Sequence, residues 1–167
     1  VRYGYIDKND SMIIKPVYEY AMPFVEGVAV VKQYDRNGMI DTKGKEVLPI
    51  KYIFVSSMNN GYFWVANEDG LALFNNKMKP LTQFLYQDAN PLSEKLYPVL
   101  RDGKWGYINT KGKEKIACQY DVAMPFKDGR AMVMKDKKYG IIDYSGDYIL
   151  PLEYGDAGMR SQAYVFS

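Results

Sequence analysis

The sequence repeats itself every 34 residues without an insertion, and this periodicity limits the fold to a small group of repeat architectures. In four of the five units the residue after the start is glycine, and the starts are Tyr3, Asn37, Leu71, Trp105 and Tyr139. A tyrosine stands at one fixed position in every unit, as Tyr18, Tyr52, Tyr86, Tyr120 and Tyr154. Units of this size cannot each bury a core alone, so we expect them to stack on one another.

Within a unit, the residue pattern predicts three short β-strands and no helix. The most complete copy, residues 105–114, alternates apolar and polar residues and then carries a Lys-Gly-Lys turn. An Asp or Asn precedes the turn glycine by three residues, a spacing typical of a type I turn followed by a left-handed glycine. The third unit lacks its starting glycine and the turn motif. A second strand, an Ala-Met-Pro-Phe type loop and a third strand follow, so each unit reads as a three-stranded antiparallel meander.

The five units can stack in two ways. We expect an all-β open array of hairpins, because a 34-residue unit is shorter than the roughly 40 to 50 residues of a propeller blade. The alternative is a closed, five-bladed ring, sealed by pairing the last third strand, residues 163–166, with residues 2–6. Either arrangement predicts one domain over residues 1–167, and the mid-unit ends also suit a piece excised from a longer array.

The most complete unit carries a recognisable signature. Its Trp105-Gly106-Tyr107-Ile108 segment is followed by Thr110-Lys111-Gly112-Lys113, a later tyrosine and a Pro-Phe-x-x-Gly loop. This pattern resembles the WG-repeat family of bacterial proteins, although Tyr, Asn or Leu replaces the tryptophan in the other units. The resemblance implies a repeat scaffold with an interaction role and no common enzymatic activity. It also favours an exported or cell-surface location, which the residues themselves do not determine.

The composition narrows the possible functions. The chain has no histidine and one cysteine, Cys118, which excludes histidine-dependent triads, histidine-containing metal sites and an intrachain disulfide. The formal net charge is +2 and the basic residues are scattered, so we expect no nucleic-acid partner. No apolar run approaches the roughly 20 residues of a membrane span, so we expect no membrane insertion. We expect no cofactor, no metal and no enzymatic activity.

The positions that recur in every unit are expected to be structural. The repeated tyrosines suit packing between units, although a ladder of aromatic faces for a sugar or a peptide is the alternative. The same packing role is predicted for Gly4, Gly38, Gly106, Gly140 and Trp105. The recurring Asp and Asn residues are expected to cap turns rather than bind calcium, because lysines surround them.

A ligand site is expected where a unit departs from the repeat pattern. The second unit replaces the Ala-Met-Pro-Phe loop with residues 55–60 and then carries the densest aromatic cluster of the chain. The predicted ligand-binding residues are Met58, Tyr62, Phe63 and Trp64. Aromatic residues dominate binding hot spots, whereas the alternative is that Tyr62 and Trp64 fill the core.

These observations favour a non-catalytic repeat scaffold that binds a protein or a cell-envelope glycan. The alternative is a structural spacer or assembly segment of a larger bacterial protein, with self-association through terminal edge strands. An enzyme is the third possibility, because no spacing among the 20 acidic residues singles out a catalytic pair such as Glu19, Glu26, Asp121 or Asp128.

Overall fold

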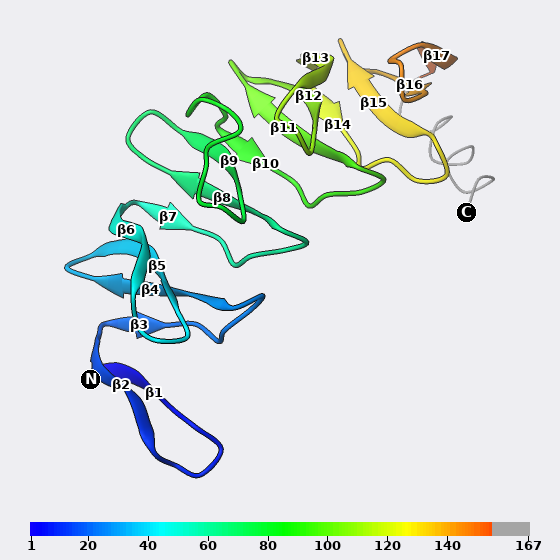
Figure 1. The fold of residues 1–167 in the computed structure, drawn as a ribbon. Helices are drawn as coiled ribbons and strands as arrows, with labels where there is room; N and C mark the ends of the chain where they lie inside the picture. Colours follow the sequence, from blue (N-terminus) through cyan, green and yellow to red (C-terminus); the bar gives the residue numbers. More distant parts are fainter. Residues whose placement is uncertain (155–167) are drawn as a thin grey trace. The chain divides into compact units, whose positions relative to one another are not determined.

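The described residues, 1–154 of a computed structural model, are organised in short strands joined by tight turns (Figure 1). Residues 1–85 contain β1 (Tyr3–Ile6), β2 (Met12–Tyr18), β3 (Tyr20–Ala21), β4 (Val28–Gln33), β5 (Arg36–Asp41), β6 (Glu46–Tyr52), β7 (Phe54–Val55), β8 (Tyr62–Ala66) and β9 (Leu71–Asn75). Residues 86–154 contain β10 (Asp88–Ala89), β11 (Leu96–Arg101), β12 (Lys104–Asn109), β13 (Glu114–Tyr120), β14 (Val122–Ala123), β15 (Ala131–Lys135), β16 (Lys138–Ile142) and β17 (Tyr148–Tyr154). This part of the chain has no helix long and apolar enough to cross a membrane.

The strands form separate antiparallel sheets in which neighbours in the sheet are also neighbours in the chain. Residues 1–85 hold the sheets β1-β2, β3-β4-β5-β6 and β7-β8-β9, and residues 86–154 hold β10-β11-β12-β13 and β14-β15-β16-β17. None of these sheets closes into a barrel. The predicted all-β fold of five antiparallel repeats is confirmed. The expected strand at residues 163–166 lies outside the described residues.

Each complete sheet is offset from the sequence unit. In the sheet β3-β4-β5-β6, β4 ends one sequence unit, and it pairs with β5, which begins the next. A two-residue strand that follows the repeated tyrosine adds to the three predicted ones, with Tyr20 opposite Lys32 and Ala21 opposite Val31. Such a strand is too short to display an alternating pattern, so the sequence does not reveal it. The sheet is therefore built from two successive sequence units.

The predicted turns are present in every unit. In the turn at Asn109, the side-chain Oδ1 accepts the amides of Lys111 and Lys113, and Gly112 has a φ of 81°. The third unit, expected to lose this motif, keeps its geometry: Asn75 Oδ1 accepts the amides of Lys77 and Lys79. Met78 takes the glycine position there with a φ of 60°. The third unit instead lacks the strand that follows the turn, and only a bridge from Phe74 to Pro80 replaces it.

The described residues form two compact units, 1–85 and 86–154, each with its own core, whereas the sequence predicts one domain. In the first unit, the sheet β3-β4-β5-β6 is buried on both faces. Ala29, Val31 and Ile40 pack with Ile14 and Tyr18 on one face. On the other, the residues that pack together are Val30, Met39, Leu48, Val55, Met58, Phe63, Val65, Ala72 and Phe74. The sheets thus stack as the sequence predicts.

In the second unit, a single cluster joins the sheets β10–β13 and β14–β17. It contains Leu96, Tyr107, Ile116, Tyr120, Ala123, Phe126, Ala131, Val133 and Ile142. The repeated Gly106 lies where β12 approaches β13 most closely, because an added Cβ would stand 2.6 Å from the Ile116 carbonyl oxygen. Position 106 therefore has no room for a side chain.

Candidate functional site

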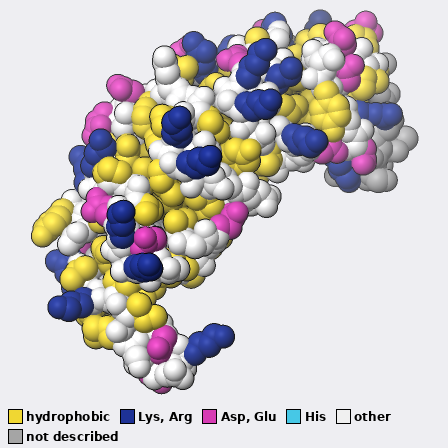
Figure 2. Space-filling view, viewed as in Figure 1, with side chains coloured by type: hydrophobic (Ala, Val, Ile, Leu, Met, Phe, Trp, Pro, Cys, Tyr) yellow, Lys and Arg dark blue, Asp and Glu magenta, His cyan; other side chains and the backbone are white. Residues whose placement is uncertain are grey.

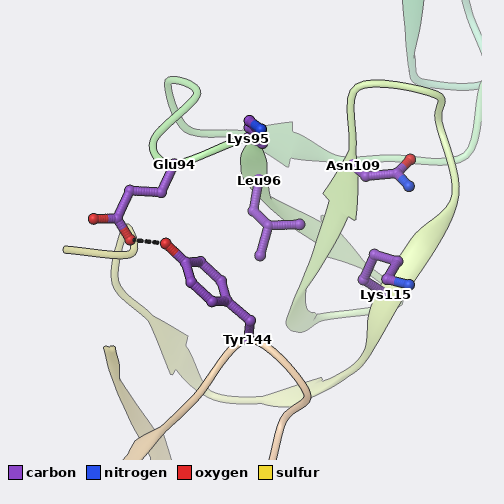
Figure 3. Close-up of a pocket in the computed structure, with 6 residues that line it drawn as sticks. All are labelled: Glu94, Lys95, Leu96, Asn109, Lys115 and Tyr144. Carbon is purple, nitrogen blue, oxygen red and sulfur yellow. Dashed lines mark hydrogen bonds between the residues drawn. The ribbon is translucent and has the colours of Figure 1, made fainter. Parts of the chain in front are cut away.

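A pocket of about 390 Å³ opens on the surface of residues 86–154 (Figure 3). Its lining residues are Glu94, Lys95, Leu96, Asn109, Lys115 and Tyr144. Glu94 and Lys95 belong to the loop before β11, Asn109 ends β12, and Tyr144 lies in the turn between β16 and β17. The volume is near the lower end of the range for small-molecule sites.

The Glu94 carboxylate fixes one side of the pocket. Its Oε1 accepts the Asp128 amide at 2.5 Å, and its Oε2 accepts the Gly129 amide at 3.0 Å. The Tyr144 hydroxyl donates to the same Oε2 at 2.5 Å, as Figure 3 shows. One carboxylate therefore holds together the loop before β11, the loop before β15 and the β16–β17 turn.

The Tyr144 ring is held by the core beneath it. It stacks on Phe126 with ring centroids 5.0 Å apart, and Phe126 is only 1% exposed. Phe126 in turn packs against Tyr107 at 4.8 Å, and the Tyr107 hydroxyl donates to the Met124 carbonyl at 2.6 Å. Tyr144 itself remains 45% exposed. The pocket thus presents an aromatic ring on a rigid base.

The remaining lining groups supply polar and positive chemistry. The exposed Lys95 and Lys115 contribute ammonium groups, and the buried Leu96 contributes apolar surface. The Asn109 Oδ1 is fixed by two turn amides, which leaves its Nδ2 oriented as a donor. The pocket therefore combines an aromatic surface, two cations and an amide donor.

The contact between Glu94 and Tyr144 shifts the pKa values of both groups. The Tyr144 hydroxyl, aided by the Gly129 and Asp128 amides, lowers the pKa of Glu94 below its usual 4.5. The Glu94 carboxylate raises the pKa of Tyr144 above its usual 10.0. The contact stabilises the fold fully between these two values. That stabilisation is lost as pH falls through the lowered Glu94 pKa or rises through the raised Tyr144 pKa.

Replacing Glu94 with glutamine is expected to lower the pKa of Tyr144 toward 10, because the neutral amide no longer disfavours the phenolate. A pH titration followed by NMR of ¹³C-labelled tyrosine measures this change. Glu26→Gln is the matched control, since Glu26 accepts the Gly61 amide at 3.1 Å in the equivalent loop of the first unit. An unchanged Tyr144 titration in Glu94→Gln would contradict the contact.

The residues predicted as a ligand site divide between the two faces of β8. Phe63 is 1% exposed and Met58 4% exposed, and both lie in the core cluster of the first unit. These two residues offer no surface to a ligand, because the alternation of β8 turns Phe63 and Val65 inward. Tyr62 and Trp64 share the opposite face and are half-buried, and Trp64 donates its amide to Ser56 Oγ at 2.8 Å.

The recurring residues occupy packing positions wherever they are described. Tyr18, Tyr86 and Tyr120 are buried, and Tyr52 is half-buried with its ring between those of Phe74 and Phe84. Trp105 packs against the core cluster of the second unit. An added Cβ at Gly4, Gly38, Gly106 or Gly140 would lie closer than 3.0 Å to the carbonyl of the paired strand. The side chain of Tyr154 lies outside the described part.

Sequence reasoning missed Glu94 and Tyr144. Tyr144 occupies the repeat position that holds Lys8, Thr42, Asn76 and Thr110 in the other units. An aromatic residue at a position that is otherwise polar is a departure from the repeat, and it was the available signal. Glu94 shares its repeat position with Glu26, and both accept a glycine amide of the following unit.

The other candidate groups have structural partners. Glu19 accepts the amides of Tyr34 and Asp35, and Asp121 accepts that of Asp136. Burial, with a smaller contribution from Glu114, raises the pKa of Cys118 to about 12. Among the described residues no group of three or more acidic or cysteine side chains is placed to hold a metal ion.

Solved structures similar to this chain share its strand arrangement only loosely. The N-terminal domain of Nup159 matches with a TM-score of 0.49 and 10% identity, covering 87% of this chain and 46% of its own. KlHsv2 with a replaced loop matches with a TM-score of 0.45 and 10% identity, covering 74% and 47%. An extracellular domain of a hybrid two-component system from B. thetaiotaomicron matches at 0.38 and 14%, covering 92% and 24%. The chain spans less than half of each matched structure.

Family comparison gives a specific result. No curated protein sequence matches the chain. The model of the WG containing repeat matches five successive segments, residues 3–36, 38–70, 73–105, 105–139 and 139–159. Because these matches span nearly all of the sequence and follow its 34-residue period, the chain belongs to the WG containing repeat family.

Proposed function

We propose that this chain is a non-catalytic repeat scaffold that binds an acidic glycan in the pocket beside Tyr144. The observation that carries the proposal is the rigid placement of a half-exposed tyrosine among two lysines and an amide donor. Aromatic rings pack against the apolar faces of sugar rings, and lysine ammonium groups attract carboxylates. A carboxylate-bearing saccharide satisfies both features.

The polar groups of the pocket support binding rather than catalysis. Both Glu94 oxygens already accept hydrogen bonds, and its lowered pKa disfavours a general-acid role at neutral pH. The raised pKa of Cys118 keeps the thiol protonated, which disfavours a nucleophile. A shallow pocket of this kind suits a dissociation constant of about 10 µM to 1 mM.

Replacing Tyr144 with alanine is expected to weaken binding of oligogalacturonate about tenfold, because the sugar loses its aromatic surface. Replacing Lys115 with alanine is expected to weaken it about threefold and to reduce its dependence on salt. Isothermal titration calorimetry, repeated with neutral oligosaccharides of equal length, measures both effects.

The matched control is Lys111→Ala, which removes an exposed lysine from the neighbouring turn without altering the pocket lining. Its affinity for oligogalacturonate should equal that of the unchanged chain. Equal affinity for neutral and acidic oligosaccharides would contradict the role of the lysines. Absence of saturable binding to either class would overturn the glycan proposal.

Intrinsic fluorescence tests the other predicted site in the same titration. Trp64 and Trp105 are the only tryptophans, so a ligand-induced change that disappears in Trp64→Phe would assign the site to β8 and to Tyr62 beside it. A protein partner is the occupant that such a surface favours, because tyrosine and tryptophan are enriched at protein interfaces.

A further inference from the structure

The first strand of the chain lacks a neighbour that its counterparts have. The equivalent strands β5, β9, β12 and β16 each pair with the strand before them, namely β4, β8, β11 and β15. Among the described residues β1 pairs with β2 alone. The other edge of β1 therefore presents backbone donors and acceptors that can receive a further strand.

Side-chain burial identifies the same gap. Ile6 is 61% exposed, whereas the residues at its position in the other units, Ile40, Phe74, Ile108 and Ile142, are at most 3% exposed. Each of those four stands opposite a buried residue of the preceding strand, and these partners are Ala29, Phe63, Tyr97 and Ala131. Ile6 thus has the character of an interior residue that is missing its partner.

The surroundings of Ile6 are unusually apolar for an exposed region. Seven of the 16 exposed large hydrophobic side chains among the described residues fall within residues 1–20; they are Val1, Tyr3, Ile6, Met12, Ile13, Val17 and Tyr20. Elsewhere on the face seen in Figure 2, Lys and Arg side chains are scattered among acidic and apolar ones. An apolar group of this kind around an open strand edge marks an interaction surface.

The sequence of residues 156–166 carries the two strands that the sheet β1-β2 lacks. Asp156-Ala157 follows Tyr154 with the spacing at which Asp88-Ala89, which form β10, follow Tyr86. Residues 164–166 fall at the repeat positions of Val28–Val30 in β4. These residues lie outside the described part of the chain, so their sequence alone supports the assignment.

We propose that residues 156–166 of one copy add to the free edge of β1 in a second copy and join the two chains head to tail. The register of the β4–β5 hairpin, with Ala29 opposite Ile40, places Val165 opposite Ile6. The donor and acceptor surfaces differ, so the contact is heterologous and each chain keeps one free donor and one free acceptor. Chains therefore associate progressively as concentration rises.

Two single substitutions test the two sides of this contact. Ile6→Lys alters the acceptor, and its 61% exposure allows the lysine to be accommodated in the isolated chain. Val165→Lys alters the donor. Sedimentation velocity over a roughly hundredfold concentration range should show the unchanged chain associating, and each variant should require at least about tenfold higher concentration.

Mixing the two variants gives the sharpest result. The intact tail of the Ile6→Lys chain can pair with the intact β1 of the Val165→Lys chain, while the other contact opposes two lysines. The mixture should therefore form a dimer and nothing larger. Ile53→Lys is the control, because Ile53 is 47% exposed and the repeat places Glu19, Gln87 or Asp121 at its position. This variant should associate like the unchanged chain.

Three results would overturn the proposal. The unchanged chain would remain monomeric over the whole concentration range, the mixture would fail to form a dimer, or Ile53→Lys would dissociate as strongly as the other variants. A monomer in which Ile6→Lys and Val165→Lys both lower the thermal midpoint would instead assign the tail to β1 of the same chain and reject the second copy. Far-UV circular dichroism verifies that every variant is folded.

Discussion

Replacing Phe126 with alanine is expected to lower the free energy of unfolding of residues 86–154 by about 3–5 kcal/mol. Phe126 is 1% exposed and lies between the Tyr107 ring at 4.8 Å and the Tyr144 ring at 5.0 Å. Its removal leaves a cavity beneath Tyr144, so oligogalacturonate binding should weaken together with stability. Urea unfolding followed by Trp105 fluorescence, in a Trp64→Phe background, measures the effect in this unit.

The repeat supplies a matched control for this prediction. Phe24 occupies the equivalent position in the first unit and packs on Tyr5 at 4.7 Å, but it is only half-buried. Phe24→Ala should therefore cost less than Phe126→Ala, because less apolar surface is lost from the core. An equal cost for the two variants would show that burial beneath Tyr144 is not the source of the effect.

Replacing Gly106 with alanine is expected to cost about 3 kcal/mol or more. The added Cβ would lie 2.6 Å from both the Cys118 nitrogen and the Ile116 carbonyl oxygen. Both are backbone atoms of β13, so β12 and β13 must separate to admit the methyl group. Chemical denaturation of Gly106→Ala against the unchanged chain measures the loss.

Gly103 provides the comparison for this second prediction. Its φ is +74°, but nothing lies within 4 Å of an added Cβ. Gly103→Ala should therefore cost only about 1 kcal/mol, which is the penalty of a left-handed conformation for alanine. If Gly106→Ala proved no more destabilising than Gly103→Ala, close approach of the strands would not explain the repeated glycine.

The sequence was sufficient for the repeat, the strands and the turns, because these features depend on local patterns that recur five times. The Asp or Asn at the start of each turn makes hydrogen bonds to residues within four positions of itself, so its role follows from spacing. The buried tyrosines, such as Tyr120, are equally visible as a fixed phase in the repeat. Recurrence identifies packing because every unit faces the same neighbours.

Features that depend on a single long-range contact were not predictable in this way. Phe63 and Met58 look like surface anchors in the sequence, but the alternation of β8 and the adjoining loop place them in the core. The bond between Glu94 and Tyr144 joins residues 50 positions apart, and no pattern in either segment specifies the other. The turn at Met78 persists because Asn75 supplies its hydrogen bonds even without glycine.

The strictly sequential strand order also affects how the chain is made. In every described sheet, each strand pairs only with strands that come directly before or after it in the chain. Loop closure is therefore short throughout, and no strand waits for a distant segment. On the ribosome, the sheet β3-β4-β5-β6 can form once residues 20–52 have emerged, while later units are still being translated. Synthesis then extends a growing stack of finished sheets, which limits the time that any unpaired strand edge is exposed to aggregation.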